Sequence, residues 1–181
     1  MQELSLHVLD LVQNAVRAGA TDISVTMEER SAEHLLTITV ADNGCGMDAE
    51  LLERALRPGF STKPQGGGMG LPLFREAAER TGGSLSVESS PGLFTKVTAR
   101  FHTDHANYVK IGSMSDTFVI VMVGHADVVF TYSRSCDDRS FSLSTTQMVQ
   151  LLGNVPLSAK PVLEWTVTTI EGQTALLCSE A

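Results

Sequence analysis

The chain has 181 residues, a formal net charge of −8 and 43% hydrophobic residues. This length suits one domain, or one domain with a small companion, and the apolar content is enough for a core without disulfides or metal. The acidic charge comes without a basic arm or patch, which excludes the usual kind of nucleic-acid-binding protein.

The sequence also bears on the compartment. It has no apolar run of the roughly 18–20 residues that a membrane span needs, and its start lacks the basic flank and apolar stretch of a signal peptide. Cys45, Cys136 and Cys178 lie far apart, which argues against a zinc site or a disulfide framework. We therefore expect a cytoplasmic protein with no membrane partner, because this cysteine usage fits a reducing cytosol.

Helical and strand-like patterns alternate in the first part of the chain. Leu4, Val8 and Leu11 recur at helical spacing, whereas Ile23 and Val25 alternate as in a strand. The expected elements are helices over residues 4–18, 48–56 and 71–80, strands around 23–27, 36–40, 85–87 and 97–101, and a glycine-rich loop over 59–70. This order indicates an α/β (α+β) two-layer sandwich, with a largely antiparallel sheet covered by helices on one face.

Residues 103–181 are expected to form a small α+β unit after a polar linker over 102–108. The predicted elements are paired strands at 118–123 and 128–132, a helix at 145–152, and a second hairpin of strands at 163–170 and 174–178. The predicted domains are therefore 1–102 and 103–181, the second being an accessory or interaction unit.

The first helix carries a line of polar residues beside its apolar stripe. At about 100° per residue, His7, Asp10, Asn14 and Arg17 fall within an arc of roughly 80°. This line fits an ordinary solvated face as well as a ligand-binding face, so the helix alone leaves both open.

Residues 42–47, with the sequence DNGCGM, follow directly after an apolar strand. A carboxylate at a strand end, Asp42, can accept a hydrogen bond from the exocyclic amine of a base. The two glycines let the backbone approach a flat ring. A plain turn uses the same residue types, so this motif alone is also ambiguous.

Residues 66–71, with the sequence GGGMGL, open the third predicted helix. Glycines at a helix start expose backbone N–H groups and the positive end of the helix dipole, which suits phosphate. Lys63 is a candidate counter-charge, and a flexible connector is the alternative. The chain has no GxxxxGK[ST] loop and no GxGxxG after a strand, so Walker and Rossmann sites are excluded.

Together, in this order and at these intervals, the motifs resemble those of the GHKL (histidine-kinase-like) ATPases, which include gyrase B, MutL, histidine-kinase and anti-sigma-kinase domains. Residues 11–20 resemble their N box, 42–46 the G1 box, 60–63 the F box of histidine kinases and 66–71 the G2 box. Residues 82–92 resemble the strand region that follows. The resemblance covers about residues 3–101 and implies a Bergerat-type mixed sheet, whereas residues 103–181 resemble nothing comparable.

The resemblance implies roles for individual residues. Asn14 would bind Mg²⁺ through its amide oxygen, Arg17 would face the phosphates of ATP, and Asp42 would accept from the adenine amino group. The other residues that the resemblance marks for nucleotide binding are Gly44, Gly46, Met47, Phe60, Lys63, Gly66, Gly68, Met69, Gly70, Leu71 and Thr95.

Two departures from the family pattern affect turnover. ATPases of this family place a glutamate as general base four residues before the asparagine, where this chain has Asp10, one methylene shorter. We expect slow or absent hydrolysis, because the position of a base decides its efficiency. The lid between Phe60 and Gly66 is short, which predicts fast nucleotide exchange and modest affinity.

Three hypotheses of function follow from the resemblance. The first is a protein kinase that transfers the γ-phosphate in trans to a histidine or serine of a partner protein. The alternatives are an anti-sigma-type regulatory module that binds ATP without catalysis, and a slow GHKL ATPase. Residues 103–181 are expected to capture the partner, to form a homodimer or simply to cover the sheet.

Overall fold

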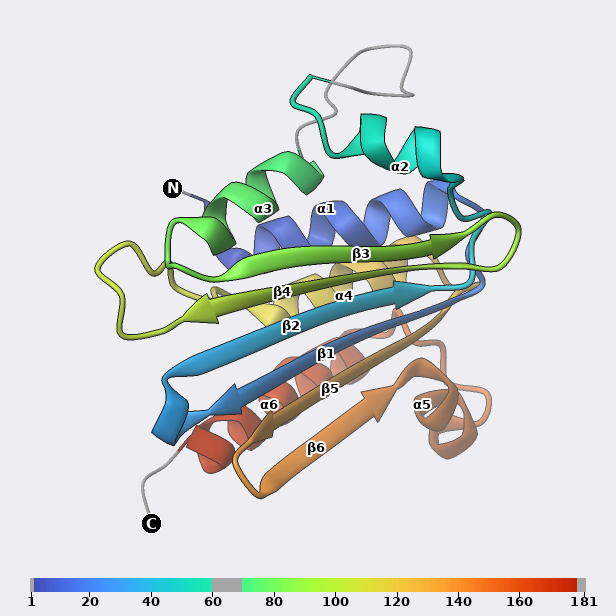
Figure 1. The fold of residues 1–181 in the computed structure, drawn as a ribbon. Helices are drawn as coiled ribbons and strands as arrows, with labels where there is room; N and C mark the ends of the chain where they lie inside the picture. Colours follow the sequence, from blue (N-terminus) through green and yellow to red (C-terminus); the bar gives the residue numbers. More distant parts are fainter. Residues whose placement is uncertain (1, 60–69, 179–181) are drawn as a thin grey trace.

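The computed structural model describes residues 2–59 and 70–178, and within them six strands form one sheet in the order β3-β4-β2-β1-β5-β6 (Figure 1). The strands are β1 (Asp22–Arg30), β2 (Leu35–Asp42), β3 (Ser84–Ser90), β4 (Phe94–His102), β5 (Val129–Cys136) and β6 (Arg139–Ser144). The helices are α1 (Leu4–Arg17), η1 (Ser31–Glu33), α2 (Ala49–Ala55), α3 (Gly70–Glu79), α4 (Met114–Gly124), α5 (Thr145–Leu152) and α6 (Lys160–Cys178).

Alternating side chains give the sheet one buried face. Ile23, Val25 and Met27 of β1 are fully buried, and so are Leu36 and Ile38 of β2. Because successive strand residues point to opposite faces, one whole row of side chains enters the core and the other stays outside. The strands predicted from this alternation in residues 1–102 are confirmed, as are the three helices predicted there.

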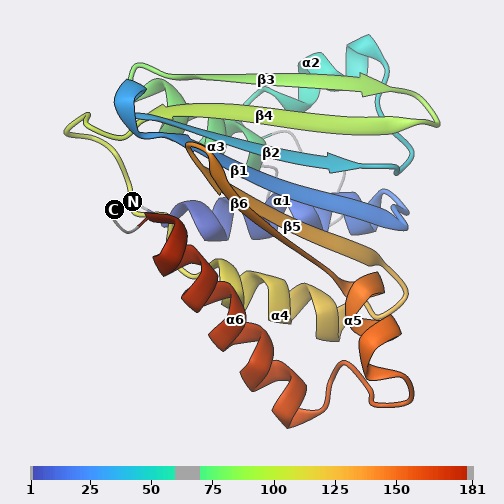
Figure 2. The ribbon, with the colours of Figure 1, turned by 90° about the horizontal axis from the view of Figure 1, so that it is seen from below.

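The helices cover the buried face of the sheet. α1 and α3 pack beneath the β1–β4 part, while α4 and α6 lie beneath β5, as Figure 2 shows from below. Phe74 of α3, Phe101 of β4, and Phe118 of α4 with Phe130 of β5 fill the space between the layers. The predicted fold class, a mixed sheet with helices on one face, is confirmed.

The second part of the chain extends the sheet of the first. β5 pairs in parallel with β1 from Asp22↔Val129 to Glu29↔Cys136, and β6 then pairs antiparallel with β5. A strand had been predicted at 128–132, but its parallel pairing with β1 and the strand β6 had not. Residues on both sides of the predicted boundary at 102 therefore contribute strands to one sheet and side chains to one core.

Two segments predicted as strands are helices. Residues 118–123 belong to α4, which is capped at its N-terminus by Ser113, whose Oγ accepts a hydrogen bond from the Asp116 N–H at 3.1 Å. Residues 118–123 are all apolar, so the run had no helical periodicity to distinguish it from a strand rich in β-branched residues.

Residues 163–170 and 174–178 likewise belong to one continuous helix, α6, and not to a hairpin. Its buried residues, Val162, Thr166, Ile170 and Leu177, follow a helical spacing, and the Thr166 hydroxyl donates to the Val162 carbonyl at 2.7 Å. Gly172 falls between the two predicted strands, but it lies inside the helix, with open space where a Cβ would stand. The helix 145–152 was predicted correctly and is α5.

None of the helices in the described parts of the chain combines the length and the apolarity that a membrane-spanning helix requires.

The helical form of α4 has a measurable consequence. Phe118 is fully buried and Ile120 is 49% exposed, whereas a strand would direct both side chains to the same face. We expect Phe118→Ala to lower the free energy of unfolding by about 3–5 kcal/mol in urea titrations. The matched variant Ile120→Ala should cost under about 1 kcal/mol, and similar losses from the two variants would contradict the helix.

Candidate nucleotide-binding site

Asp42 is the last residue of β2, where its neighbours in the sheet are Ile23 of β1 and Thr95 of β4. The Asp42 side chain is half-buried, and its Oδ1 accepts a hydrogen bond from the Gly44 N–H at 2.9 Å. Burial raises the pKa of the Asp42 carboxyl above its ordinary value, and the hydrogen bond from Gly44 partly offsets this rise. A fixed, partly desolvated acceptor therefore stands at the end of a central strand.

The loop after Asp42 fits tightly between α1 and β3. A Cβ added to Gly44 would lie 2.9 Å from the Cβ of Ala18, and the Cys45 N–H donates to the Ala18 carbonyl at 2.9 Å. Gly46 has a φ of +62°, and a Cβ there would collide with the carbonyl oxygen of Ser90. Packing within the chain thus requires these glycines, whatever else the loop binds.

Two polar side chains that the sequence did not single out hold this loop in place. The Asn43 Oδ1 accepts from the N–H groups of Thr21 and Asp22, both at 2.9 Å, and so fixes the loop to the start of β1. The Ser89 Oγ accepts from the Met47 N–H at 2.8 Å and lies 2.9 Å from the Thr95 Oγ1. The asparagine within DNG was a visible signal for the first role, since Asn side chains often bond local backbone. Ser89 carried no comparable signal.

The exposed face of α1 carries Asn14 and Arg17, with the half-buried Asp10 one turn earlier. The Arg17 guanidinium donates a hydrogen bond to the Asn14 Oδ1, the atom predicted to bind Mg²⁺. The predicted polar face of α1 is therefore present at these three residues.

α1 lies against both glycine-containing segments. Gly44 contacts Ala18 just after the end of α1, and Gly70, the first residue of α3, faces Asp10, since an added Cβ would stand 3.3 Å from the Asp10 Cβ. These contacts are about 12 Å apart along the helix at 1.5 Å per residue. Asn14 lies between them.

The structure thus brings most of the predicted site together. The loop after Asp42 carries Met47, and Ser89 links Met47 to Thr95 by hydrogen bonds. Gly70 and the half-buried Leu71 begin α3, where Gly70 lies beside Asp10. The predicted residues Phe60, Lys63, Gly66, Gly68 and Met69 lie outside the described residues.

His7 does not share the exposed face on which the sequence placed it. Its side chain is 2% exposed and is stacked on Phe74, with the ring centroids 5.6 Å apart. Burial lowers the pKa of His7, and the nearby Asp10 carboxylate partly offsets this. His7 is therefore a core residue that joins α1 to α3.

A surface depression of about 360 Å³ lies elsewhere, lined by Glu28, Arg30, Leu35, Thr37 and Arg100. Leu35 and Arg30 pair at the end of the β1–β2 hairpin opposite Asp42, and these side chains alternate with the buried row. The depression is therefore on the uncovered face of the sheet and is separate from the site around Asp42.

A family model described as "Histidine kinase-, DNA gyrase B-, and HSP90-like ATPase" matches residues 2–105 of the chain. Among curated relatives, the sensor histidine kinase ZraS of Klebsiella oxytoca is 39% identical over 92 residues, which are 49% of this chain and 20% of that protein. The histidine protein kinase DivJ of Caulobacter vibrioides is 38% identical over 98 residues, which are 51% of this chain and 16% of DivJ. The chain therefore spans a fifth or less of these relatives.

Solved structures with the same fold match more of the chain than residues 2–105. The N-terminal domain of a DNA repair protein aligns with a TM-score of 0.56 and 17% identity, over 80% of this chain and 53% of its own. The Aquifex aeolicus MutL ATPase domain complexed with ADP aligns with a TM-score of 0.51 and 16% identity, over 79% of this chain and 64% of its own. At these identities the likeness concerns the fold.

The raised pKa of Asp42 predicts that ionisation of this carboxyl lowers the stability of the folded state. The folded state binds the Asp42 proton more tightly than the unfolded state, whose pKa is near 3.8, so stability falls as pH rises from 3.8 through the folded pKa. We expect Asp42→Asn to raise the melting temperature at pH 7, and this gain should shrink as pH approaches 4. The exposed control Asp104→Asn should leave the melting temperature at pH 7 close to that of the parent, and a lower melting temperature for Asp42→Asn at pH 7 would contradict this expectation.

Proposed function

Because the chain belongs to the histidine kinase-, DNA gyrase B- and HSP90-like ATPases, we propose that it binds Mg-ATP at the site around Asp42 and α1. We propose further that it transfers the γ-phosphate in trans to a partner protein. The observation that carries the nucleotide proposal is the fixed Asp42 carboxylate, half-buried at the end of β2 and held by the Gly44 N–H. The similarity to histidine kinases supports the kinase reading.

Asp42 has the chemistry to select adenine. An ionised carboxylate only accepts hydrogen bonds, so it pairs with an exocyclic amine and repels the carbonyl that guanine has at the same place. Because the loop is fixed by Asn43 and Ser89, the acceptor is already positioned before a ligand arrives. Met47 and Thr95 would border the base and its neighbouring groups.

The polar face of α1 suits Mg²⁺ and phosphate. Mg²⁺ prefers oxygen ligands and keeps several waters, so the exposed Asn14 amide oxygen would suffice as the protein ligand. When bound, the ion would neutralise phosphate charge and orient the γ-phosphate. Arg17 now donates to that same oxygen, so this hydrogen bond would have to break, which would free the guanidinium for a phosphate oxygen.

The start of α3 would face the phosphates. The first N–H groups of a helix have no partner within the helix and favour anions, and Gly70 carries no side chain there. In this proposal Gly66, Gly68, Met69 and Lys63 precede this helix start along the chain, and Phe60 begins the same segment.

Asp10 is the candidate base, and its position bears on the reaction. Its side chain is half-buried against Gly70 and is one methylene shorter than the glutamate of family ATPases. We propose that it polarises the attacking group weakly, which favours transfer to a well-placed protein acceptor over hydrolysis. The two alternative functions are a regulatory module that binds ATP without catalysis and a slow ATPase.

Residues 103–181 would be the accessory part that contacts the partner or a second copy of the chain. Several large apolar side chains of this part are exposed, including Leu151 at 83% and Trp165 at 50%. Apolar groups at a surface are favourable places for protein contact when they cluster.

The Asp42 carboxylate should contribute directly to ATP affinity. Asp42→Asn should weaken ATP binding about 10- to 100-fold by isothermal titration calorimetry, since a charge-assisted hydrogen bond is worth about 1.5–3 kcal/mol. Asp104→Asn, the same substitution in the exposed loop after β4, should bind as the parent does. Unchanged affinity in folded Asp42→Asn protein would refute the adenine site.

The reaction can be tested with γ-labelled ATP, Mg²⁺ and candidate partner proteins. Transfer to a partner histidine should give acid-labile label on that partner, and transfer to serine should give acid-stable label. Asn14→Ala should abolish either signal, because the amide oxygen for Mg²⁺ is lost. Free phosphate without labelled protein would instead support the ATPase, and neither product would support the binding module.

A further inference from the structure

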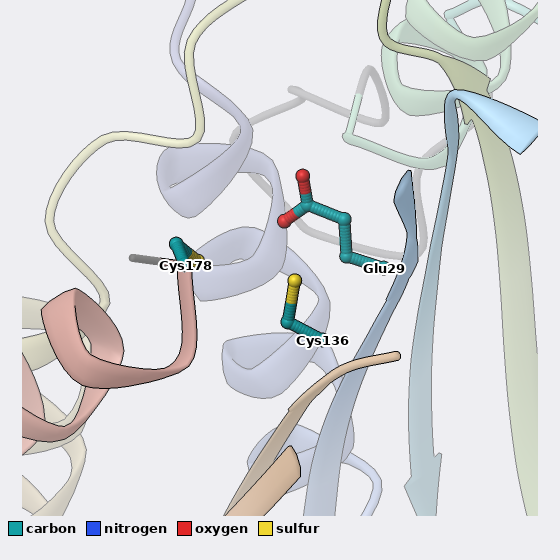
Figure 3. A group of neighbouring side chains, drawn as sticks. All are labelled: Glu29, Cys136 and Cys178. Carbon is teal, nitrogen blue, oxygen red and sulfur yellow. The ribbon is translucent and has the colours of Figure 1, made fainter. Parts of the chain in front are cut away.

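Three side chains that are distant in the sequence meet at the end of the sheet remote from Asp42. Glu29 lies near the end of β1, Cys136 ends β5 and Cys178 ends α6, and one carboxylate oxygen and the two sulfurs all lie within 4.8 Å of one another. Figure 3 shows the Glu29 carboxylate directed toward the two thiols. β1 separates this cluster from the Asp42 end by about 20 Å, at 3.3 Å per residue from Ile23 to Glu29.

Pairing of β1 with β5 fixes two members of the cluster relative to each other. Glu29 and Cys136 are register partners in the parallel ladder, and the Asp137 N–H donates to the Glu29 carbonyl at 2.9 Å. Cys136 is buried and Cys178 is exposed, so the group lies at the rim of the core where solvent ions reach it.

Arg134 supplies a buried positive charge beside the cluster. Its side chain is 5% exposed, and one terminal nitrogen lies 3.2 Å from the Glu29 Oε2 and 3.5 Å from the Cys178 Sγ. A guanidinium only donates hydrogen bonds, so the sulfur of Cys178 is the acceptor. The Arg134 Nε has no hydrogen-bond partner among the described residues.

Each sulfur therefore has a polar group within hydrogen-bonding distance. Arg134 faces Cys178, and the Ser31 hydroxyl lies 3.6 Å from the Cys136 Sγ. Polar groups in these places orient metal ligands from the outer shell. The charges also balance, because two thiolates and one carboxylate carry three negative charges, which a divalent cation and Arg134 together cancel.

We propose that Glu29, Cys136 and Cys178 bind a thiophilic divalent cation, Zn²⁺ in particular, with water as the fourth ligand. The ligand atoms of tetrahedral zinc are roughly 3.5–3.8 Å apart, given Zn–S of about 2.3 Å and Zn–O of about 2.0 Å, so side-chain rotations would close the cluster. Binding releases a proton from each thiol to solvent. The ion would tie the last turn of α6 to the ends of β1 and β5.

The site is tested on the reduced, metal-free chain. Equilibrium dialysis should show one Zn²⁺ per chain, and Co²⁺ should give the intense near-ultraviolet absorption of thiolate-to-cobalt charge transfer. Cys136→Ser and Cys178→Ser should each weaken Zn²⁺ binding about 100-fold or more, since even outer-shell changes cost 10- to 100-fold. Glu29→Gln, which keeps the side-chain shape, should also weaken it.

Cys45→Ser is the matched control, because Cys45 lies in the loop after β2, at the Asp42 end. It should keep Zn²⁺ binding, and Cys178→Ser should keep ATP binding, which separates this proposal from the proposed function. Zn²⁺ affinity equal to the parent in the folded cysteine variants would overturn the proposal. Bound Zn²⁺ should also slow the air oxidation of Cys136 and Cys178 to a disulfide. An equal rate of thiol loss with and without Zn²⁺ would likewise overturn the proposal.

Discussion

The structure depends on β1 being paired along both of its sides. β2 runs antiparallel along one side and β5 runs parallel along the other, while Ile23, Val25 and Met27 enter the core. A parallel pair needs a crossover, and the chain makes it through α4, which lies beneath β5. The proposed nucleotide site and the proposed metal site lie at opposite ends of this strand.

α1 supplies the second constraint, because one helix serves the core and the proposed nucleotide site at once. Leu4, Val8 and Val12 are fully buried against the sheet, whereas Asn14 and Arg17 remain exposed on an adjoining arc. Since the buried stripe fixes the rotation of the helix, it also fixes the direction of the polar residues. The contacts of Ala18 with Gly44 and of Asp10 with Gly70 then position the loop after Asp42 and the first residue of α3 against this helix.

Sequence patterns predicted those elements whose conformation depends on neighbouring residues along the chain. Alternation gave β1 and β2, and the DNG segment located the turn that presents Asp42. α4 and α6 were missed because their apolar or threonine-rich sequences have strand propensity, and burial against other elements overrides propensity. His7 was placed by periodicity on a polar face, although stacking on Phe74 decides its burial.

The cysteines show why some features cannot be read along the chain. Their wide spacing argued against a zinc site, and no local motif joins residues 29, 136 and 178. Parallel pairing of β1 with β5 makes Glu29 and Cys136 neighbours, and the length of α6 brings Cys178 back to the same end of the sheet. Arg134 then meets both Glu29 and Cys178, because it lies on β5 two residues before Cys136 and points to the same face. Proximity of this kind comes from topology, so a spacing rule tests only those metal sites whose ligands share one turn or hairpin.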